Sequence, residues 1–134
     1  MARNTKDVTI TAEGRDKGKV FHLTEMPATQ SEKWAFRLFL ALSRAGFEVP
    51  DDIQAAGMAG IAALGLQSIG KLSWADAEPL IDEMFGCVQV VPDPSRPEVI
   101  RRLIESDIEE IGTRMFLRKE IFGLHVSFST PAKA

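Results

Sequence analysis

The segment that most constrains this chain is a strongly apolar helix expected between Gln30 and Gly46. Ser31 is the expected N-cap, and Gly46 stands where a left-handed C-terminal cap is common. One face carries apolar residues at helical spacing: Trp34, Ala35, Leu38, Phe39 and Leu42. Phe36 and Leu40 add apolar groups off that face. A helix this apolar must be covered from more than one side, by its own chain or by a partner.

Composition bounds the class of protein. The 134 residues fit one domain, expected over 1–134, and the 45% hydrophobic content is enough to bury a core. A formal net charge of −3 argues against a dedicated nucleic-acid binder, which needs clustered positive charge. The single cysteine cannot form an internal disulfide, which suits a reducing cytosol. The polar start is unlike a signal peptide, so secretion is not expected.

The uncharged stretch from Ile53 to Gly70 raises the question of a membrane span. Glycines, Gln54, Gln67 and Ser68 dilute its apolar character, whereas a span needs about 20 predominantly apolar residues. We therefore expect a second helix here, and no membrane insertion. Its many small residues leave two interpretations open: close helix packing within the domain, or an adaptable surface for a partner helix.

A β-hairpin is predicted over residues 7–27. Apolar and polar residues alternate from Val8, Gly14 to Gly18 supplies turn chemistry, and a second apolar run precedes Pro27. The turn carries Arg15 and Lys17 but lacks the GxxxxGK[ST] spacing of a phosphate-binding loop, so we interpret it as a solvated turn. Residues 1–6 are expected to be a disordered end.

Two more helices are predicted after the small-residue stretch. Ser73 and Asp76 suggest a capping box for the third, and Pro79 falls in its first turn if the helix starts nearer Asp76. An extended segment follows at Val88–Val91. Ser95 and Glu98 suggest a capping box for the fourth. Its expected apolar stripe is Ile100, Ile104, Ile108, Ile111, Met115 and Phe122.

The predicted fold class is therefore mainly α, with about four helices forming a helical body over 28–128. The N-terminal β-hairpin is marginal by itself and is expected to lie against a helix or to pair with another strand. Alternation at Leu124, Val126 and Phe128 suggests a short C-terminal strand beside the hairpin, and 130–134 is expected to be a disordered tail.

No constellation of catalytic or metal-ligating residues is visible in the sequence. His22 and His125 are not spaced for metal binding, and Cys87 is expected to be a buried structural thiol. Asp107, Glu109 and Glu110 are interpreted as a solvated helix face. We expect no enzyme activity, no metal and no cofactor.

Two parts of the chain resemble the tail assembly chaperones of long-tailed bacteriophages and prophages. The first is GRDKGKVFHLTEMPA at Gly14–Ala28, followed by EKWA at Glu32–Ala35. The second lies near the C-terminus: DIEEI at Asp107–Ile111, LRKE at Leu117–Glu120, and His125-Val126. The matching segments carry no catalytic signature.

The resemblance implies a non-enzymatic assembly factor of the host bacterial cytoplasm that is absent from the mature virion. Such chaperones coat the tape measure protein before tail tube subunits polymerise around it. Many family genes also yield a longer, frameshifted product thought to recruit the tail tube protein. The resemblance brings no invariant binding residues with it.

The expected partner-binding residues come from the apolar helix and the small-residue stretch: Trp34, Phe36, Phe39, Leu40 and Met58. Exposed apolar area of this kind also favours self-association into a homo-oligomer. Two alternatives stay open at this point. One is a structural minor tail or connector protein of the virion, and the other is a small regulatory or toxin-inhibiting interaction module.

Overall fold

The computed structural model describes residues 3–46 and 69–129, and it corrects the predicted fold class. The described residues form an α+β fold in which a four-stranded antiparallel sheet is combined with three α-helices. The prediction of a mainly α protein with about four helices is wrong, because β2 pairs with a strand far away in sequence as well as with its hairpin neighbour. The small-residue helix expected from Ile53 lies largely outside the described residues.

The elements follow one another along the chain in this order: β1 (Thr5–Thr9), β2 (Val20–Thr24), α1 (Ala28–Arg44), the 3₁₀-helix η1 (Ile69–Lys71), α4 (Trp74–Phe85), β3 (Val88–Val91), β4 (Arg101–Arg102), the 3₁₀-helix η2 (Glu105–Asp107) and α5 (Ile111–Ser129).

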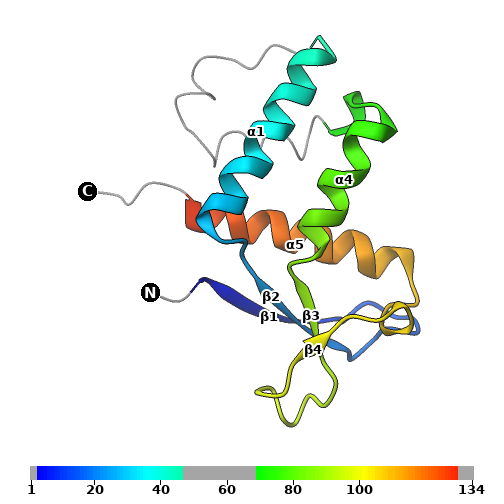
Figure 1. Cartoon of the computed structure of the whole chain (residues 1–134). Helices are drawn as coiled ribbons and strands as arrows, with labels where there is room; N and C mark the ends of the chain where they lie inside the picture. The colour runs from blue at the N-terminus through cyan, green and yellow to red at the C-terminus, as the bar shows by residue number, and fades with distance from the viewer. Residues whose placement is uncertain (1–2, 47–68, 130–134) are drawn as a thin grey trace.

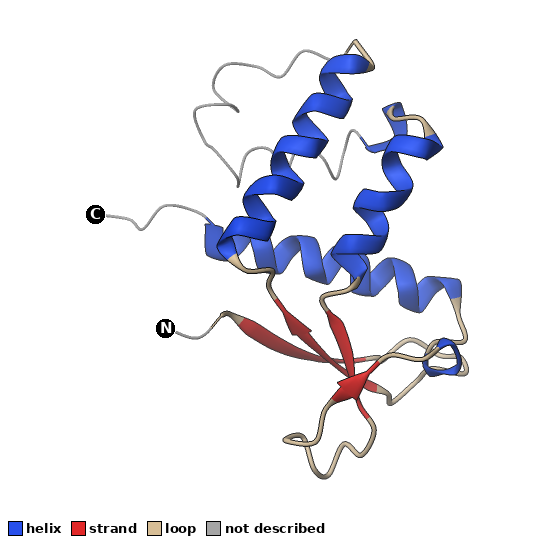
Figure 2. Cartoon of the chain, in the orientation of Figure 1, coloured by secondary structure: helices blue, strands red, loops and turns tan. Residues whose placement is uncertain are grey.

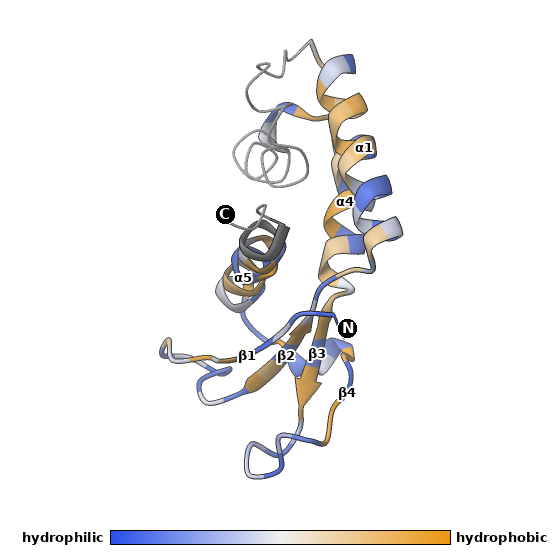
Figure 3. Ribbon diagram, turned by 90° about the vertical axis from the view of Figure 1, so that its left-hand side faces the viewer, coloured by the Kyte–Doolittle hydropathy of each residue, from blue (hydrophilic) through white to orange (hydrophobic). Residues whose placement is uncertain are grey.

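The helices are arranged around the two central strands. α1 continues from β2 and α4 leads into β3, so this helix pair rises side by side from one end of the sheet (Figures 1 and 2). α5 crosses on one side of both the helix pair and the sheet, as the turned view shows (Figure 3). One face of α1 therefore points towards α5, and its opposite face points away from the rest of the described fold.

The predicted hairpin is confirmed as the β1–β2 pair, with Val8 opposite Phe21. It begins earlier than expected: Thr5 pairs with Thr24 and Lys6 with Leu23, so the prediction of a disordered end over 1–6 is wrong at these two residues. The extended segment Val88–Val91 is also confirmed, as β3. It pairs with β2 and thus lies inside the sheet order β1-β2-β3-β4.

The core lies between the sheet, the helix pair and α5. Alternate strand residues such as Phe21 and Leu23 are buried and make one face of the sheet apolar, as expected for a half-buried sheet. The Trp34 ring meets Phe122 of α5 edge to face, with centroids 5.7 Å apart. Segments from Val8 to Leu124 thus contribute to one apolar cluster.

The ends of α1 and α4 partly follow the predicted signals. α1 begins at Ala28 after Pro27, so Ser31 is not its N-cap; the Ser31 hydroxyl instead donates to the Met26 carbonyl. Gly46 does adopt a left-handed φ of 86° after the helix, as predicted. Ser73 caps α4 by accepting from the Asp76 N–H, but Pro79 lies inside the helix and beyond its first turn.

The long fourth helix predicted from Glu98 is wrong in its first half. Asp107 explains why, because its carboxylate accepts from both terminal guanidinium nitrogens of Arg101 at 2.7 and 2.9 Å and from the Ile104 N–H at 2.7 Å. These contacts fold the chain into β4 and η2. The capping box predicted at Ser95 is also absent, since Ser95 donates through its N–H and hydroxyl to Asp93.

Helix α5 runs from Ile111 to Ser129, so the short C-terminal strand predicted at Leu124–Phe128 is wrong. The buried face of α5 also differs from the predicted stripe. Its core residues include Leu117, Ile121 and Leu124, whereas Ile111 is 80% exposed. The spacing of these buried residues places them on one side of a helix.

A buried carboxylate joins the hairpin turn to the start of α5. Asp16 is 1% exposed and accepts hydrogen bonds from the N–H groups of Glu109 and Glu110, from the Thr113 hydroxyl at 2.7 Å and from Lys19 Nζ at 2.8 Å. Burial alone raises the pKa of Asp16, but these hydrogen bonds outweigh it and hold the pKa well below the ordinary 3.8. Next to it, Arg15 pairs with Glu110 at 2.8 Å. The basic turn is therefore docked on α5.

We expect Asp16→Asn to lower the free energy of unfolding at pH 7 by about 2 kcal/mol, because the amide cannot satisfy all the donors around it. The pKa of Asp16 is lower in the folded protein than in the unfolded chain. The contribution of the carboxylate to the free energy of unfolding is therefore complete at pH values above the unfolded-state pKa, and it is lost as the pH falls through the folded-state pKa. Urea denaturation should thus show a smaller difference between wild type and variant at about pH 3 than at pH 7. Glu78→Gln, on an exposed residue of α4, is the control, and an equal difference at both pH values would contradict this role.

Candidate partner-binding site

The outer face of α1 carries two large apolar side chains that the described fold leaves in solvent. Phe36 is 56% exposed and Leu40 is 59% exposed. They are four residues apart, so they are neighbours on the helix surface, about 6 Å apart along its axis. We call this pair, Phe36 and Leu40, the α1 ridge. It lies opposite the buried residues of α1, which include Trp34 and Leu38.

The other sequence-predicted residues do not share this position. Trp34 is fully buried, and its indole Nε1 donates to the Leu80 carbonyl at 2.9 Å, so its side chain belongs to the core. Phe39 is only partly exposed, at the border between core and surface. Met58 lies outside the described residues. Of the five candidates, the structure brings Phe36 and Leu40 together on one accessible face.

Ion pairs fix α1 against α4 beside the ridge. Arg37 pairs with Glu83, which also accepts from Gln30 at 3.0 Å, and Arg44 pairs with Asp76 at 2.5 Å. The Arg44 guanidinium keeps the pKa of Asp76 below its ordinary value, so this carboxylate stays ionised at neutral pH. The ridge is thus carried by a helix that is anchored by its core face and by its flank.

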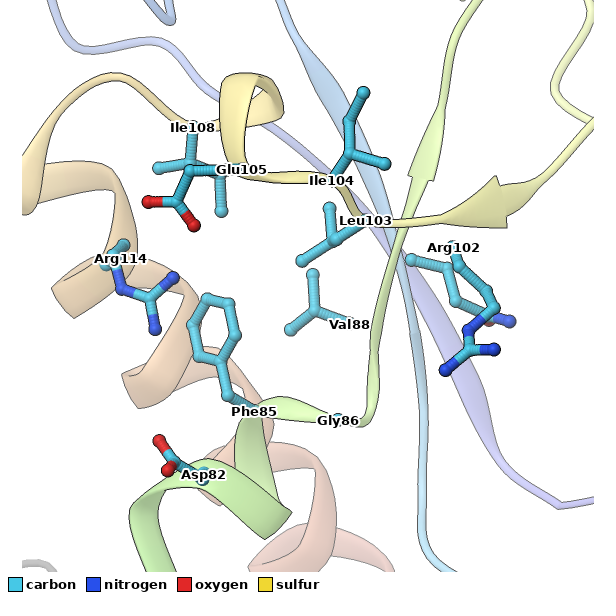
Figure 4. Close-up of a pocket in the computed structure, with 11 residues that line it drawn as sticks. Asp82, Phe85, Gly86, Val88, Arg102, Leu103, Ile104, Glu105, Ile108 and Arg114 are labelled. Atoms are coloured by element: carbon cyan, nitrogen blue, oxygen red, sulfur yellow. The ribbon is translucent and has the colours of Figure 1, made fainter. Parts of the chain in front are cut away.

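A second surface feature is a groove of about 570 Å³ where α4, β3, the β4–η2 segment and the start of α5 meet (Figure 4). Phe85, Val88 and Leu103 form its apolar part. The Arg114 guanidinium lies 4.1 Å from the centre of the Phe85 ring, a cation–π contact, while the Arg102 side chain points away from this ring.

Sequence reasoning missed this groove. Its Leu103 and Ile108 were assigned to one long helix, and the exposed Ile104 and Met115 were assigned to that helix's apolar stripe. Hydrophobic periodicity gives no sign of the turn at Asp107 that separates these segments, because the turn is set by specific bonds of the Asp107 carboxylate to the Ile104 N–H and the Arg101 guanidinium.

Both histidines of the chain make structural contacts. His22 Nδ1 lies 2.5 Å from Asp7 on the polar face of the hairpin. His125 is buried; its Nε2 accepts from the Met26 N–H at 3.0 Å, so Nδ1 carries the proton and donates to the Ile121 carbonyl. Among residues 3–46 and 69–129, no group of three or more His, Cys, Asp or Glu side chains is placed to hold a metal ion.

Cys87 is buried, as predicted for a structural thiol. Burial, and secondarily the negative charge of Glu83, raise the pKa of its thiol to about 11. A thiol of this kind carries almost no thiolate at neutral pH and is a poor nucleophile.

Fold and site together define an α+β protein whose outer helix face carries an apolar ridge. No family model, curated protein or solved structure matches the chain. Within the part of the chain that the structure describes, no helix has the length and apolar character that crossing a bilayer requires.

The two tryptophans provide a direct check of the surface assignment. Trp34 is fully buried and Trp74 is 66% exposed. In Trp74→Phe, the remaining Trp34 emission should be blue-shifted and resist acrylamide quenching. In Trp34→Phe, the remaining Trp74 emission should be red-shifted and readily quenched. Equal quenching of the two variants in their folded state would contradict the assignment of Trp34 to the core.

The raised pKa of Cys87 predicts that its thiol reacts slowly with disulfide reagents. At pH 7.5, reaction of the native thiol with a disulfide reagent should be at least about a hundredfold slower than in urea-unfolded protein, because the thiol is buried and protonated. Absorbance of the released thiolate measures both rates. Rapid stoichiometric reaction of the folded protein would indicate an accessible, activated cysteine.

Proposed function

We propose that this chain is a non-enzymatic tail assembly chaperone of a long-tailed bacteriophage or prophage. In this proposal it acts in the host bacterial cytoplasm, binds the tape measure protein, keeps it soluble, and helps to recruit tail tube subunits. It is then absent from the mature virion. The proposal starts from the resemblance of Gly14–Ala28 and of the C-terminal segments to that family.

The observation that carries the proposal is the exposed α1 ridge. A chaperone for an aggregation-prone helical protein has to offer apolar area to its client while remaining folded itself. Phe36 and Leu40 offer such area on a helix whose opposite face is fixed in the core. The same exposed area favours self-association, which is why we include a homo-oligomer in the proposal.

The ridge gives a direct test by co-expression with the tape measure protein that the proposal expects to be encoded beside this gene. Phe36→Asp combined with Leu40→Asp should abolish solubilisation of the tape measure protein, because two charges replace the apolar contact. The variant itself should stay folded, since both side chains already face solvent. The fraction of tape measure protein in the soluble lysate and its co-purification measure the effect.

Val99→Asp is the matched control, because Val99 is 43% exposed but lies far from α1 in the sequence, in the segment before β4. It should leave solubilisation intact. If the ridge variant is folded, as judged by circular dichroism, and still solubilises the tape measure protein, the ridge is not the client site. Mass spectrometry of purified virions separates a chaperone, which should be missing, from a structural tail protein.

A further inference from the structure

The charged residues beside the α1 ridge are distributed unequally between its two sides. Three cationic residues, Lys33, Arg37 and Arg44, each lie three or four positions from Phe36 or Leu40. At about 100° of rotation per residue, all three fall on the same side of the ridge, the side facing α4. On the other side the only charged residue within four positions is Glu32, next to Phe36.

The ion pairs with α4 leave this cationic side exposed to a ligand. The Arg37 side chain is 45% exposed, whereas that of its partner Glu83 is 25% exposed. Likewise, the Arg44 side chain is 65% exposed, whereas that of its partner Asp76 is 28% exposed. The carboxylates thus lie deeper between the helices and the guanidinium groups lie further out. Lys33 is exposed, and no ion pair joins it to the described residues.

The spacing of the ridge favours a helical ligand. Two apolar side chains one turn apart on a straight helix pack well against the apolar stripe of a second helix, as in ridges-into-grooves packing. Charges that border such a stripe select partners by complementary charge, as flanking residues do in coiled coils.

From this asymmetry we infer that the α1 ridge binds an amphipathic helix of the tape measure protein whose apolar stripe is bordered by acidic residues on the side that meets Lys33, Arg37 and Arg44. The assignment of this helix to the tape measure protein rests on the proposed function. The charge pattern rests on the structure alone. Glu32 on the opposite side makes the contact asymmetric, so one orientation of the bound helix is preferred.

Two designed helical peptides with the same leucine stripe test the charge pattern on the full chain. One carries glutamates along one border of the stripe, and the other carries lysines at the same positions. Fluorescence anisotropy of the labelled peptides should give a Kd about tenfold lower for the glutamate peptide at low ionic strength, and added salt should reduce this preference.

Charge reversal locates the contact. Lys33→Glu should weaken binding of the glutamate peptide severalfold and strengthen binding of the lysine peptide, because it reverses a charge beside the ridge that no ion pair within the described residues neutralises. Lys119→Glu is the matched control, since Lys119 is an exposed lysine four residues from the exposed Met115 on α5. It should change neither Kd. Circular dichroism confirms that both variants are folded, and Lys33→Gln provides a milder change at the same position.

The outcomes separate this inference from the proposed function. Equal affinity for the two peptides, no detectable binding of either, or loss of binding in Lys119→Glu instead of Lys33→Glu overturns the charge pattern, even if the tape measure protein is solubilised. A glutamate preference that depends on Lys33 supports it. If that preference is found while co-expression with the tape measure protein fails, the charge pattern stands and the proposed function falls.

Discussion

The buried carboxylate of Asp16 is the contact on which the arrangement of the described fold most depends. It satisfies the N–H groups of Glu109 and Glu110 just before α5, in the way a side-chain cap satisfies a helix end, but it comes from the far end of the chain. It thereby fixes where α5 begins relative to the β1–β2 hairpin. With that start fixed, Leu117 and Ile121 join the apolar cluster that includes Phe21 and Leu23 of the sheet, and Phe122 contacts Trp34.

The placement of α5 decides which side of α1 is available. α5 takes the inner face of α1, and α4 is tied to its flank through Glu83 and Asp76. The outer face, with Phe36 and Leu40, has neither neighbour. The same tertiary contacts that build the core therefore leave the ridge on a supported helix, which keeps its two side chains at a constant spacing. Such a preorganised surface loses little conformational entropy when a partner binds.

The sequence was informative where the determinants are local. The hairpin, the left-handed Gly46, the Ser73 cap and the extended Val88–Val91 segment were all predictable, because turn chemistry, capping and alternation act over a few residues. The sheet was not, because the pairing of β3 with β2 joins distant segments. The false long helix has a different cause: the isoleucines from Ile100 to Ile111 follow a helical period, but short-range bonds of the Asp107 carboxylate to Arg101 and to the Ile104 N–H break it. On the candidate site, periodicity identified α1 but could not tell Trp34, which faces the core, from Phe36, which faces solvent.

The hydrogen bond between Asp16 and Thr113 spans 97 residues of sequence. Closing so large a loop is entropically costly, and contacts of this separation tend to form late in folding. During synthesis the Asp16 carboxylate lacks the Glu109, Glu110 and Thr113 donors until the start of α5 has left the ribosome. The segment up to Gly46, including the inner face of α1, therefore completes its packing only after α5 has been synthesised. Until then α1 exposes both of its apolar sides, and such transiently exposed apolar surface makes a nascent chain prone to aggregation.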